Sequence, residues 1–488
     1  METKPNILIF MSDQQRGDSV LPGSKAIMPN IEKFRKESVT FTNAFCPSPH
    51  CCPSRATFFS GLYPSEHGVW NNVDVGSTLS RGLNDGVRLW CEDLRDAGYR
   101  MEFNGKWHVS AEETASDRGW NNPNGFPASA PRKSGEFRPK PKTLEWNNYA
   151  KIAKQAKPEN REKGQIIRPG YSTYSHFGEM ENPFNDETVV NNAIKALKDS
   201  TKDGSPFCNY IGTCGPHDPY FVPKEFLDMY NIDDISLPAN FEDRMNDKPG
   251  LYRRTRQRFD QLSPEEHREG IRHYLAFCSY EDWLFGKVLS ALEESGQAKN
   301  TIVIYLSDHG DYMGEHGLWC KGLPCFRGAY NIPAIVRWPG ETVNPGRLEN
   351  SIITLADFAP TILDACGLTI ERSFAGRSLR PFIKNQIPSD WSDAFFTQSN
   401  GNELYGIQRS VSTRDWKYVY NGFDFDELYD LRNDPGETRN LINDTQYADI
   451  VKEMCKRLWT FAYSRGDVCI NSYIMVSHAP HGPAEAFR

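Results

Sequence analysis

Cysteine, serine and arginine side chains occur together early in the chain, in the run Cys51-Cys52-Pro53-Ser54-Arg55. Pro53 suits the first turn of a helix, and a helix that begins here directs free backbone N–H groups and its positive dipole end at Cys51. Arg55 lies four residues after Cys51, so its guanidinium can return toward the same end. The run predicts an active-site turn that favours an oxyanion. Ordinary buried thiols at a helix start are the alternative.

Two acidic residues follow predicted strands. Asp13, with Gln14 beside it, follows the first apolar run of the chain, and Asp308, with His309, follows the most strongly β-branched run. In open α/β sheets, ligand sites form beyond the carboxyl ends of the strands. The two carboxylates, joined by Gln14 and His309, therefore predict a divalent-metal site.

Lysine, tryptophan and histidine stand together in Lys106-Trp107-His108. In a strand, Lys106 and His108 share one face, whereas Trp107 faces the core. A cation and an imidazole on one face suit anion binding and proton transfer. Such a run is common by chance, and a lone histidine such as His217 is often a surface residue, so each signal gains weight only beside the others.

Together these motifs resemble one known family. The run from Cys51 to Gly61 is similar to C-x-P-S-R-x-x-x-x-[ST]-G, the signature of the type I, formylglycine-dependent sulfatases. Residues 98–108 are similar to the second signature of that family, G-Y-x(6)-G-K-W-H, and residues 216–220 to its P-H-x-P-Y segment. Residues 428–441 are similar to its C-terminal segment, so the resemblance covers nearly the whole chain.

The resemblance implies an alkaline-phosphatase-like fold and a sulfuric ester hydrolase. Only Cys51 has the required spacing to Pro53, so a maturation enzyme is expected to oxidise Cys51 to formylglycine. In the implied mechanism the aldehyde is hydrated, one hydroxyl attacks sulfur, sulfate leaves and the aldehyde is regenerated. The implied roles are sulfuryl binding by Arg55, Lys106 and Lys321; protonation of the leaving alcohol by His217; proton removal by His108; substrate contact by Asn72; and metal binding by Asp13, Gln14, Asp308 and His309.

Two positions depart from the family pattern. Many sulfatases carry a second aspartate where Gln14 stands and an asparagine where His309 stands. Similar pairs occur in relatives that cleave phosphonate monoesters and phosphodiesters, and in choline-sulfatase-like enzymes. Both kinds of enzyme are therefore rival functions, and a sulfated-glycan-binding protein with a disabled site is the non-enzyme rival. The family favours Ca²⁺ as the metal, but an imidazole ligand is more usual for Mn²⁺ or Zn²⁺, and Mg²⁺ stays open.

Strands alternate with helices over most of the chain. This order predicts an α/β fold with a large, mostly parallel sheet sandwiched by helices. We expect an N-terminal sulfatase catalytic domain at residues 1–385 and a C-terminal subdomain with an antiparallel sheet and a helix at residues 386–488. The predicted strands are residues 6–11, 206–212, 301–306, 332–338 and 408–420, and the predicted helices are residues 29–37, 264–294, 355–366 and 444–463.

Composition excludes several classes of protein. The chain has 488 residues and a net charge of −8, which argues against a general nucleic-acid binder. No apolar run is long enough for a membrane helix, and twelve cysteines are too few for a disulfide scaffold. The absence of a signal peptide predicts a cytoplasmic protein, or a periplasmic one if a leader was trimmed. Whether the chain forms a homo-oligomer stays open.

One segment differs in charge. Residues 131–170 hold eleven basic and four acidic residues, a net charge of +7. Such a field attracts anions, and nearby aromatic rings and the amides of Asn71 and Asn72 suit sugars, so we expect a sulfated carbohydrate rather than an aryl sulfate as substrate. The alternative is an insertion that packs on the domain or on a second subunit. The aromatic residues are Trp146, Tyr149, Tyr171 and Tyr174.

Overall fold

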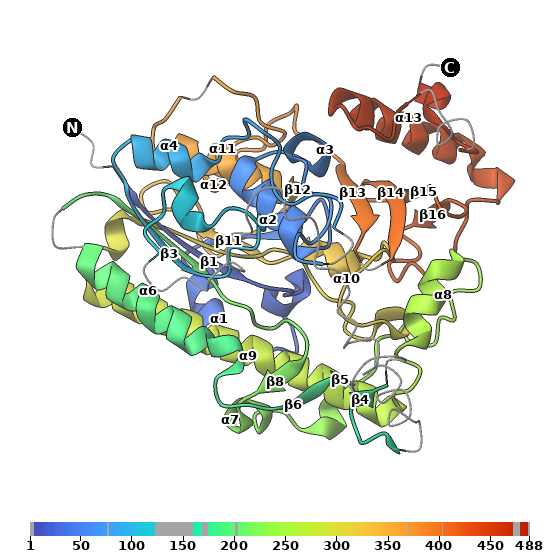
Figure 1. The fold of residues 1–488 in the computed structure, drawn as a ribbon, viewed down its shortest axis with the longest axis horizontal. Helices are drawn as coiled ribbons and strands as arrows, with labels where there is room; N and C mark the ends of the chain where they lie inside the picture. The colour runs from blue at the N-terminus through green and yellow to red at the C-terminus, as the bar shows by residue number, and fades with distance from the viewer. Residues whose placement is uncertain are drawn as a thin grey trace, which may run out of the picture.

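The computed structural model describes most of the chain (Figure 1). Most of the basic insertion at residues 131–170 lies outside the described residues, and so does Tyr171. The undescribed part of the insertion includes Trp146, Tyr149, Lys140, Lys142, Lys151 and Lys154. None of the described helices is both long enough and apolar enough to cross a membrane. The described residues are 4–75, 78–122, 160–167, 174–200, 204–369, 371–402, 404–471 and 479–486.

An eight-stranded, mostly parallel sheet forms the centre of the molecule, as the sequence predicts. Neighbouring strands run in the order β2, β11, β9, β1, β7, β3, and both β10 and β12 also pair with β2. Only β10 and β11 run antiparallel to their neighbours. The strands are β1 (Asn6–Ser12), β2 (Val39–Phe45), β3 (Arg100–Gly105), β7 (Phe207–Gly212), β9 (Thr301–Ser307), β10 (Asn331–Ile332), β11 (Ala334–Arg337) and β12 (Leu348–Thr354).

Helices cover both faces of this sheet (Figure 1). The side chains of β1 alternate between two cores: Ile7 and Ile9 pack with α2 and α4 residues, whereas Leu8 and Phe10 pack with residues of α1, α6 and α9. A strand buried on both faces reads as an unbroken apolar run. The helices are α1 (Pro29–Arg35), α2 (Cys51–Ser60), α3 (Pro64–His67), α4 (Trp90–Asp96), α6 (Asp186–Ser200), α7 (Lys224–Leu227), α8 (Gly250–Gln257), α9 (Pro264–Glu294), α10 (Arg327–Tyr330), α11 (Phe358–Ala365), α12 (Arg380–Ile383) and α13 (Ala448–Ser464).

A smaller antiparallel sheet lies at the C-terminal side, with α13 packed on it (Figure 1). Its strands are neighbours in chain order: β13 (Phe395–Gly401), β14 (Tyr405–Ser412), β15 (Trp416–Asn421) and β16 (Glu427–Asp430). The smaller C-terminal domain of the predicted fold is thus present. The boundary after residue 385 stays a prediction. Four short strands complete the fold: β4 (Gln165–Ile166), β5 (Tyr174–Ser175), β6 (Phe177–Glu179) and β8 (Tyr220–Val222).

Three local predictions were wrong. Residues 332–338 do not form one strand, because Pro333 has no N–H to donate and separates β10 from β11. Residues 408–420 form two strands, because the Thr413 hydroxyl accepts the N–H groups of Asp415 and Trp416 and closes a hairpin turn. Lys106-Trp107-His108 is not in a strand, since β3 ends at Gly105.

The two basic residues of the insertion that are described contact α9. Arg161 donates to both carboxylate oxygens of Glu266 at 2.8 Å, and the Lys163 ammonium lies 3.4 Å from Glu269. These two cations therefore anchor the insertion to the protein, which matches the packing alternative for this part of it.

Gly105 ends β3 where two backbones approach closely. Its φ is +93°, and a Cβ at this position would lie 2.0 Å from the carbonyl oxygen of Gly212 on β7. Gly98 also has a positive φ, +86°, but a Cβ there would meet no atom within 4 Å. An alanine at Gly98 would therefore introduce backbone strain alone, whereas an alanine at Gly105 would add a steric clash. Gly105 also fixes the position of the residue that follows it, Lys106.

We predict that Gly98→Ala costs about 1–2 kcal/mol of stability, the penalty of a left-handed alanine. Gly105→Ala should cost about 1–3 kcal/mol more, because the methyl group must displace the β7 backbone. Thermal unfolding of the two purified variants beside the wild type measures the difference. Equal losses would show that β3 and β7 do not approach as described.

Candidate active site

The pairing of β1 with β9 brings the two predicted carboxylates together. The strands are parallel, with Ser12 opposite Ser307, so Asp13 and Asp308 leave the sheet side by side. The backbone N–H of Gln14 donates to Asp308 Oδ1 at 3.1 Å. The strand ends are therefore neighbours, and both carboxylates are fully buried.

Helix α2 places Cys51 beside these carboxylates. The helix begins at Cys51, as the sequence predicts, and all ten of its residues are buried. Cys51 Sγ lies 3.3 Å from His309 Nε2 and 3.8 Å from Asp13 Oδ1. Ligand atoms of Asp13, Cys51, Asp308 and His309 all lie within 4.8 Å of one another.

Arg55, on α2, binds both carboxylates. Its Nε donates to Asp308 Oδ2 at 2.8 Å and its Nη2 to Asp13 Oδ2 at 3.2 Å. The guanidinium is completely buried, and its Nη1 donates to the Lys106 carbonyl and the Tyr210 hydroxyl. In this arrangement Arg55 offsets the charge of the carboxylates, whereas the sequence prediction gave it sulfuryl oxygens to hold.

Lys106 completes the charge balance around Asp13. Its ammonium donates to Asp13 Oδ2, and 18% of its side chain is exposed. Burial and Cys51 act to raise the pKa of Asp13, but Lys106, His217 and Arg55 outweigh them and hold it well below its ordinary value. Asp13 is thus an anion, while burial and the neighbouring Asp13 raise the pKa of Asp308.

Position 51 lies in a strongly positive environment. Burial alone would raise the pKa of the Cys51 thiol, but Lys106, Lys321 and His309 outweigh burial and hold the pKa well below its ordinary value. A negative group at this position is therefore stabilised by cations from three different segments. The same cations suit an anionic substrate.

Lys321, Gln14 and His217 form a second set of contacts. The Lys321 ammonium donates to Gln14 Oε1 and lies against His217 Nε2, each at 2.5 Å. Gln14 Nε2 donates to Asp311 Oδ2 at 2.6 Å. His217 Nδ1 lies 2.5 Å from the backbone carbonyl oxygen of Asp218 and 3.4 Å from Asp218 Oδ1, so the residue that follows His217 in sequence holds its ring mainly through the backbone.

Three further side chains that were predicted to act on the substrate form hydrogen bonds with other protein groups. The Tyr174 hydroxyl, predicted to suit a sugar, donates to Asp218 Oδ2 at 2.6 Å. Asn72 Oδ1 accepts the N–H of Cys52 at 3.1 Å and so caps α2. His108 Nε2 lies 3.1 Å from Asp74 Oδ1, in the loop after Asn72.

Asp74 is a residue that the sequence analysis missed. It holds the ring of His108. His108 lies beyond the end of β3 and has a φ of +50°, so the alternation of side chains along a strand does not predict the direction of its ring. Asp74, Cys52 and His108 also form a second set of closely spaced donor atoms. No motif marks Asp74, since only the fold brings its loop to His108.

The donor set at the strand ends fits a divalent metal. Asp13, Asp308 and His309 would hold it beside position 51, with the carboxylate and imidazole donors that such ions accept. When bound, the ion would supply Lewis-acid chemistry and offset the two buried carboxylates. Gln14 Oε1 faces Lys321 here, so its predicted ligand role stays a prediction.

Comparison with known proteins gives matches along nearly the whole chain. A family model described as Sulfatase matches residues 5–368, and one described as N-sulphoglucosamine sulphohydrolase, C-terminal, matches residues 314–463. The chain is 29% identical to an arylsulfatase of Clostridium perfringens, covering 93% of this chain and 94% of the relative. It is 25% identical to an N-acetylglucosamine-6-O-sulfatase of Bacteroides thetaiotaomicron, covering 94% and 86%. A solved phosphonate monoester hydrolase of Agrobacterium radiobacter shares the fold, with a TM-score of 0.74, 23% identity and coverage of 94% and 96%.

We predict that Asp13→Asn and Asp308→Asn each weaken metal binding by at least about 10–100-fold, the range seen even for residues that only support a ligand. Elemental analysis of the dialysed proteins measures the metal content. Asp186→Asn is the matched control, because this buried carboxyl binds the N–H groups of Cys214 and Gly215 and lies outside the donor set. Full metal occupancy in either variant would remove that residue from the site.

Proposed function

The chain belongs to the sulfatase family, and we propose that it hydrolyses the sulfate ester of a sulfated carbohydrate to an alcohol and inorganic sulfate. The observation that carries this proposal is the position of Cys51. It stands at the start of α2, beside the metal-donor set of Asp13, Asp308 and His309. A signature cysteine in this setting is the residue that the family uses as formylglycine, and the hydrated aldehyde would supply the nucleophile.

The cations around position 51 bind and orient the sulfate group. Lys106 and Lys321 are both partly exposed and both stabilise negative charge at position 51. They would contact the sulfuryl oxygens and offset the charge that develops during sulfur–oxygen cleavage. Arg55 is fully buried, so its part is to keep the Asp13 and Asp308 side chains in place.

Two histidines are positioned to move protons. His217 lies at hydrogen-bond distance from Lys321, on the open side of the site, where it would protonate the departing alcohol. His108, held by Asp74, would accept a proton from the residue at position 51 as sulfate leaves. His217 therefore acts on the leaving alcohol, and His108 acts on the residue at position 51.

A sulfated carbohydrate is favoured over other esters by the curated relative that is named an N-acetylglucosamine-6-O-sulfatase. The second candidate function is the hydrolysis of phosphonate monoesters or phosphodiesters. It is favoured by Gln14 and His309, the two departures from the common sulfatase pattern, and by the shared fold of the phosphonate monoester hydrolase. Turnover of an aryl sulfate compared with that of the matching aryl phosphodiester separates the two candidates.

We predict that Cys51→Ala lowers turnover by at least about 10⁴-fold, as for the loss of other nucleophiles. Cys52→Ala should retain most of the activity, because the Cys52 sulfur lies outside the donor set of Asp13, Asp308 and His309 and instead accepts the N–H of Val73. Initial rates on an aryl sulfate, with thermal unfolding as a check of folding, measure both. Similar losses in two well-folded variants would refute the assignment of residue 51.

We predict that His217→Ala slows the hydrolysis of alkyl or sugar sulfates by about 100-fold or more, the usual range for a general acid. An activated aryl sulfate should lose much less, because its leaving group needs no proton. Measuring kcat of both enzymes on a series of sulfate esters shows how the loss depends on the pKa of the leaving alcohol. An equal loss for every leaving group would assign His217 to positioning instead.

A further inference from the structure

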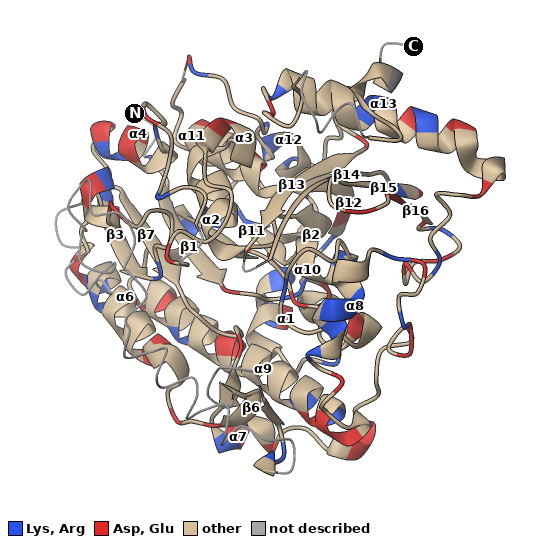
Figure 2. Cartoon of the chain, turned by 45° about the vertical axis from the view of Figure 1, so that its right-hand side comes forward, with Lys and Arg blue, Asp and Glu red and all other residues tan. Residues whose placement is uncertain are grey.

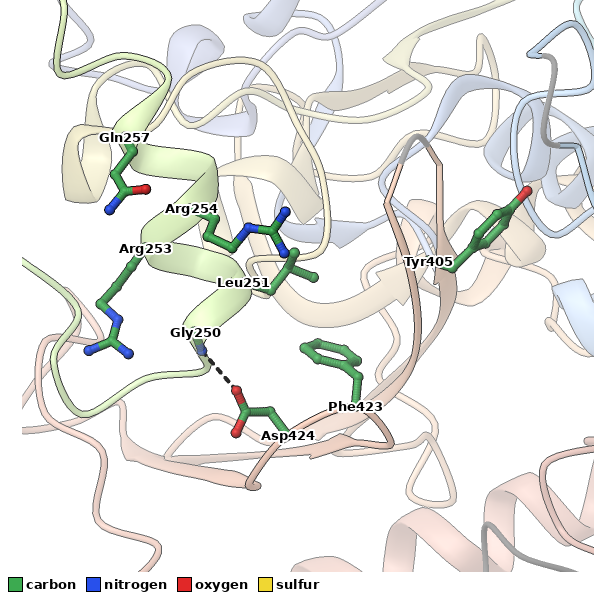
Figure 3. A pocket seen from close by; sticks show the side chains of 8 residues that line it. All are labelled: Gly250, Leu251, Arg253, Arg254, Gln257, Tyr405, Phe423 and Asp424. Carbon is green, nitrogen blue, oxygen red and sulfur yellow. Dashed lines mark hydrogen bonds between the residues drawn. The ribbon is translucent and has the colours of Figure 1, made fainter.

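A second cleft lies between α8 and the C-terminal sheet, apart from the residues around Cys51 (Figure 3). Its volume is about 780 Å³, within the usual size range of small-ligand sites. We call it the α8 cleft. Its lining residues are Gly250, Leu251, Arg253, Arg254, Gln257, Tyr405, Phe423 and Asp424.

The α8 cleft carries uncompensated positive charge. Arg253 and Arg254 are both exposed, and neither forms an ion pair within the part of the chain that the structure describes. By contrast Arg256, on the buried side of α8, donates to three backbone carbonyls. The basic residues of α8 stand out in Figure 2. A structural role thus accounts for Arg256 but not for the other two arginines.

Asp424 is the acidic residue of the lining, and its carboxylate binds the N-terminal end of α8. Its Oδ2 accepts the N–H of Gly250 at 2.8 Å, at the first residue of α8 (Figure 3). Its single negative charge leaves the lining with a net charge of +1, given Arg253 and Arg254. The cleft therefore favours an anion over a cation.

Aromatic side chains face Arg254 across the cleft. Arg254 and Leu251 point from α8 toward Tyr405 and Phe423, while Arg253 extends from the other side of the helix (Figure 3). The Tyr405 side chain is unusually open for an aromatic residue, at 45% exposure. A guanidinium binds sulfate or carboxylate through a planar pair of donors, and a flat ring suits the apolar face of a sugar. The lining thus combines the two contacts that an anionic sugar requires.

The α8 cleft is connected to the candidate active site through the turn after β13. Asn402 Oδ1 in this turn accepts the N–H of Asn72 at 3.0 Å, and Asn72 caps α2 at Cys52. Tyr405 stands three residues after Asn402, at the start of β14. The same short turn therefore contacts the site on one side and lines the cleft on the other.

The loop after Lys321 contacts the same hairpin. A Cβ at Gly406 would lie 3.0 Å from Leu323 Cδ1 and 2.4 Å from Phe423 Cδ1, so both side chains pack on this glycine. Leu323 follows Lys321 by two residues. Packing contacts thus join the loop that carries Lys321 to the aromatic wall of the cleft.

We propose that the α8 cleft is a substrate subsite, which binds a sulfate or uronate carboxylate on a sugar unit other than the one that loses its ester. This inference rests on the proposed function, since it adds a remote contact to the same substrate. It makes an oligosaccharide with several anionic groups a better substrate than a singly sulfated sugar. We expect the remote group to bind equally well in the bound substrate and in the transition state, and uniform binding of this kind lowers KM without raising kcat.

The test compares Arg254→Gln with wild type on three substrates: a tetrasaccharide with a sulfate on every unit, a tetrasaccharide with uronates and one sulfate, and an aryl sulfate. KM for at least one tetrasaccharide should rise about tenfold, the effect of losing one charged hydrogen bond, with kcat unchanged. KM for the aryl sulfate should not change. The arm that responds tells whether sulfate or carboxylate occupies the cleft.

The matched control is Arg432→Gln, which removes the charge of another exposed arginine that pairs with Asp415 outside the cleft. It should leave all three KM values unchanged. Equal KM values for Arg254→Gln and wild type on both tetrasaccharides would overturn the proposal. A rise shared by the control would also overturn it, because it would reflect overall charge.

A binding measurement separates this proposal from the proposed function. In the Cys51→Ala background, calorimetry with the fully sulfated and the uronate tetrasaccharides gives the Kd without turnover. Adding Arg254→Gln should weaken at least one Kd about tenfold. If the wild type cleaves no sulfate ester but this loss is seen, the proposed function fails while the cleft stands. If neither Kd changes, the cleft is not a subsite.

Discussion

The structure depends on a single electrostatic constraint: two carboxylates, Asp13 and Asp308, are buried side by side at the ends of β1 and β9. Like charges at this spacing repel strongly in a low-dielectric interior, so the fold must supply positive charge. Arg55 supplies it from within α2, and Lys106 supplies it from the end of β3. The close approach of β3 to β7 and the start of α2 at residue 51 position these two cations. A divalent ion held by the same carboxylates would add to this positive charge.

The same requirement for positive charge explains why the candidate active site attracts anions. Cations that neutralise the carboxylates also surround position 51, so a site built to hold two buried anions on one side attracts an anionic ester on the other. Gln14 adds to this effect. A carboxylate at position 14 would compensate Lys321, whereas the amide oxygen of Gln14 accepts its hydrogen bond and leaves the positive charge available to substrate. The departure from the common family pattern therefore makes this side of the site more positive.

Sequence reasoning found what is local or carried by a signature. β1, β9 and α9 have clear periodicity, and the placement of Asp13 beside Asp308 follows from a general rule on parallel sheets. It could not find contacts that only the fold creates. Arg55 pairs with residue 308, Asp74 reaches His108, and the α8 cleft joins segments about 150 residues apart, none of which leaves a periodic trace. The hairpin within residues 408–420 was missed because a turn closed by a threonine hydroxyl interrupts the alternation only briefly.

The proposed function requires that residue 51 is the modified nucleophile. Mass spectrometry of the peptide that contains position 51 tests it most directly, on protein produced together with a formylglycine-generating enzyme and shown to cleave an aryl sulfate. We expect residue 51 to carry the mass of the aldehyde or its hydrate and Cys52 to remain a thiol. An unmodified thiol at position 51 in fully active enzyme would contradict it.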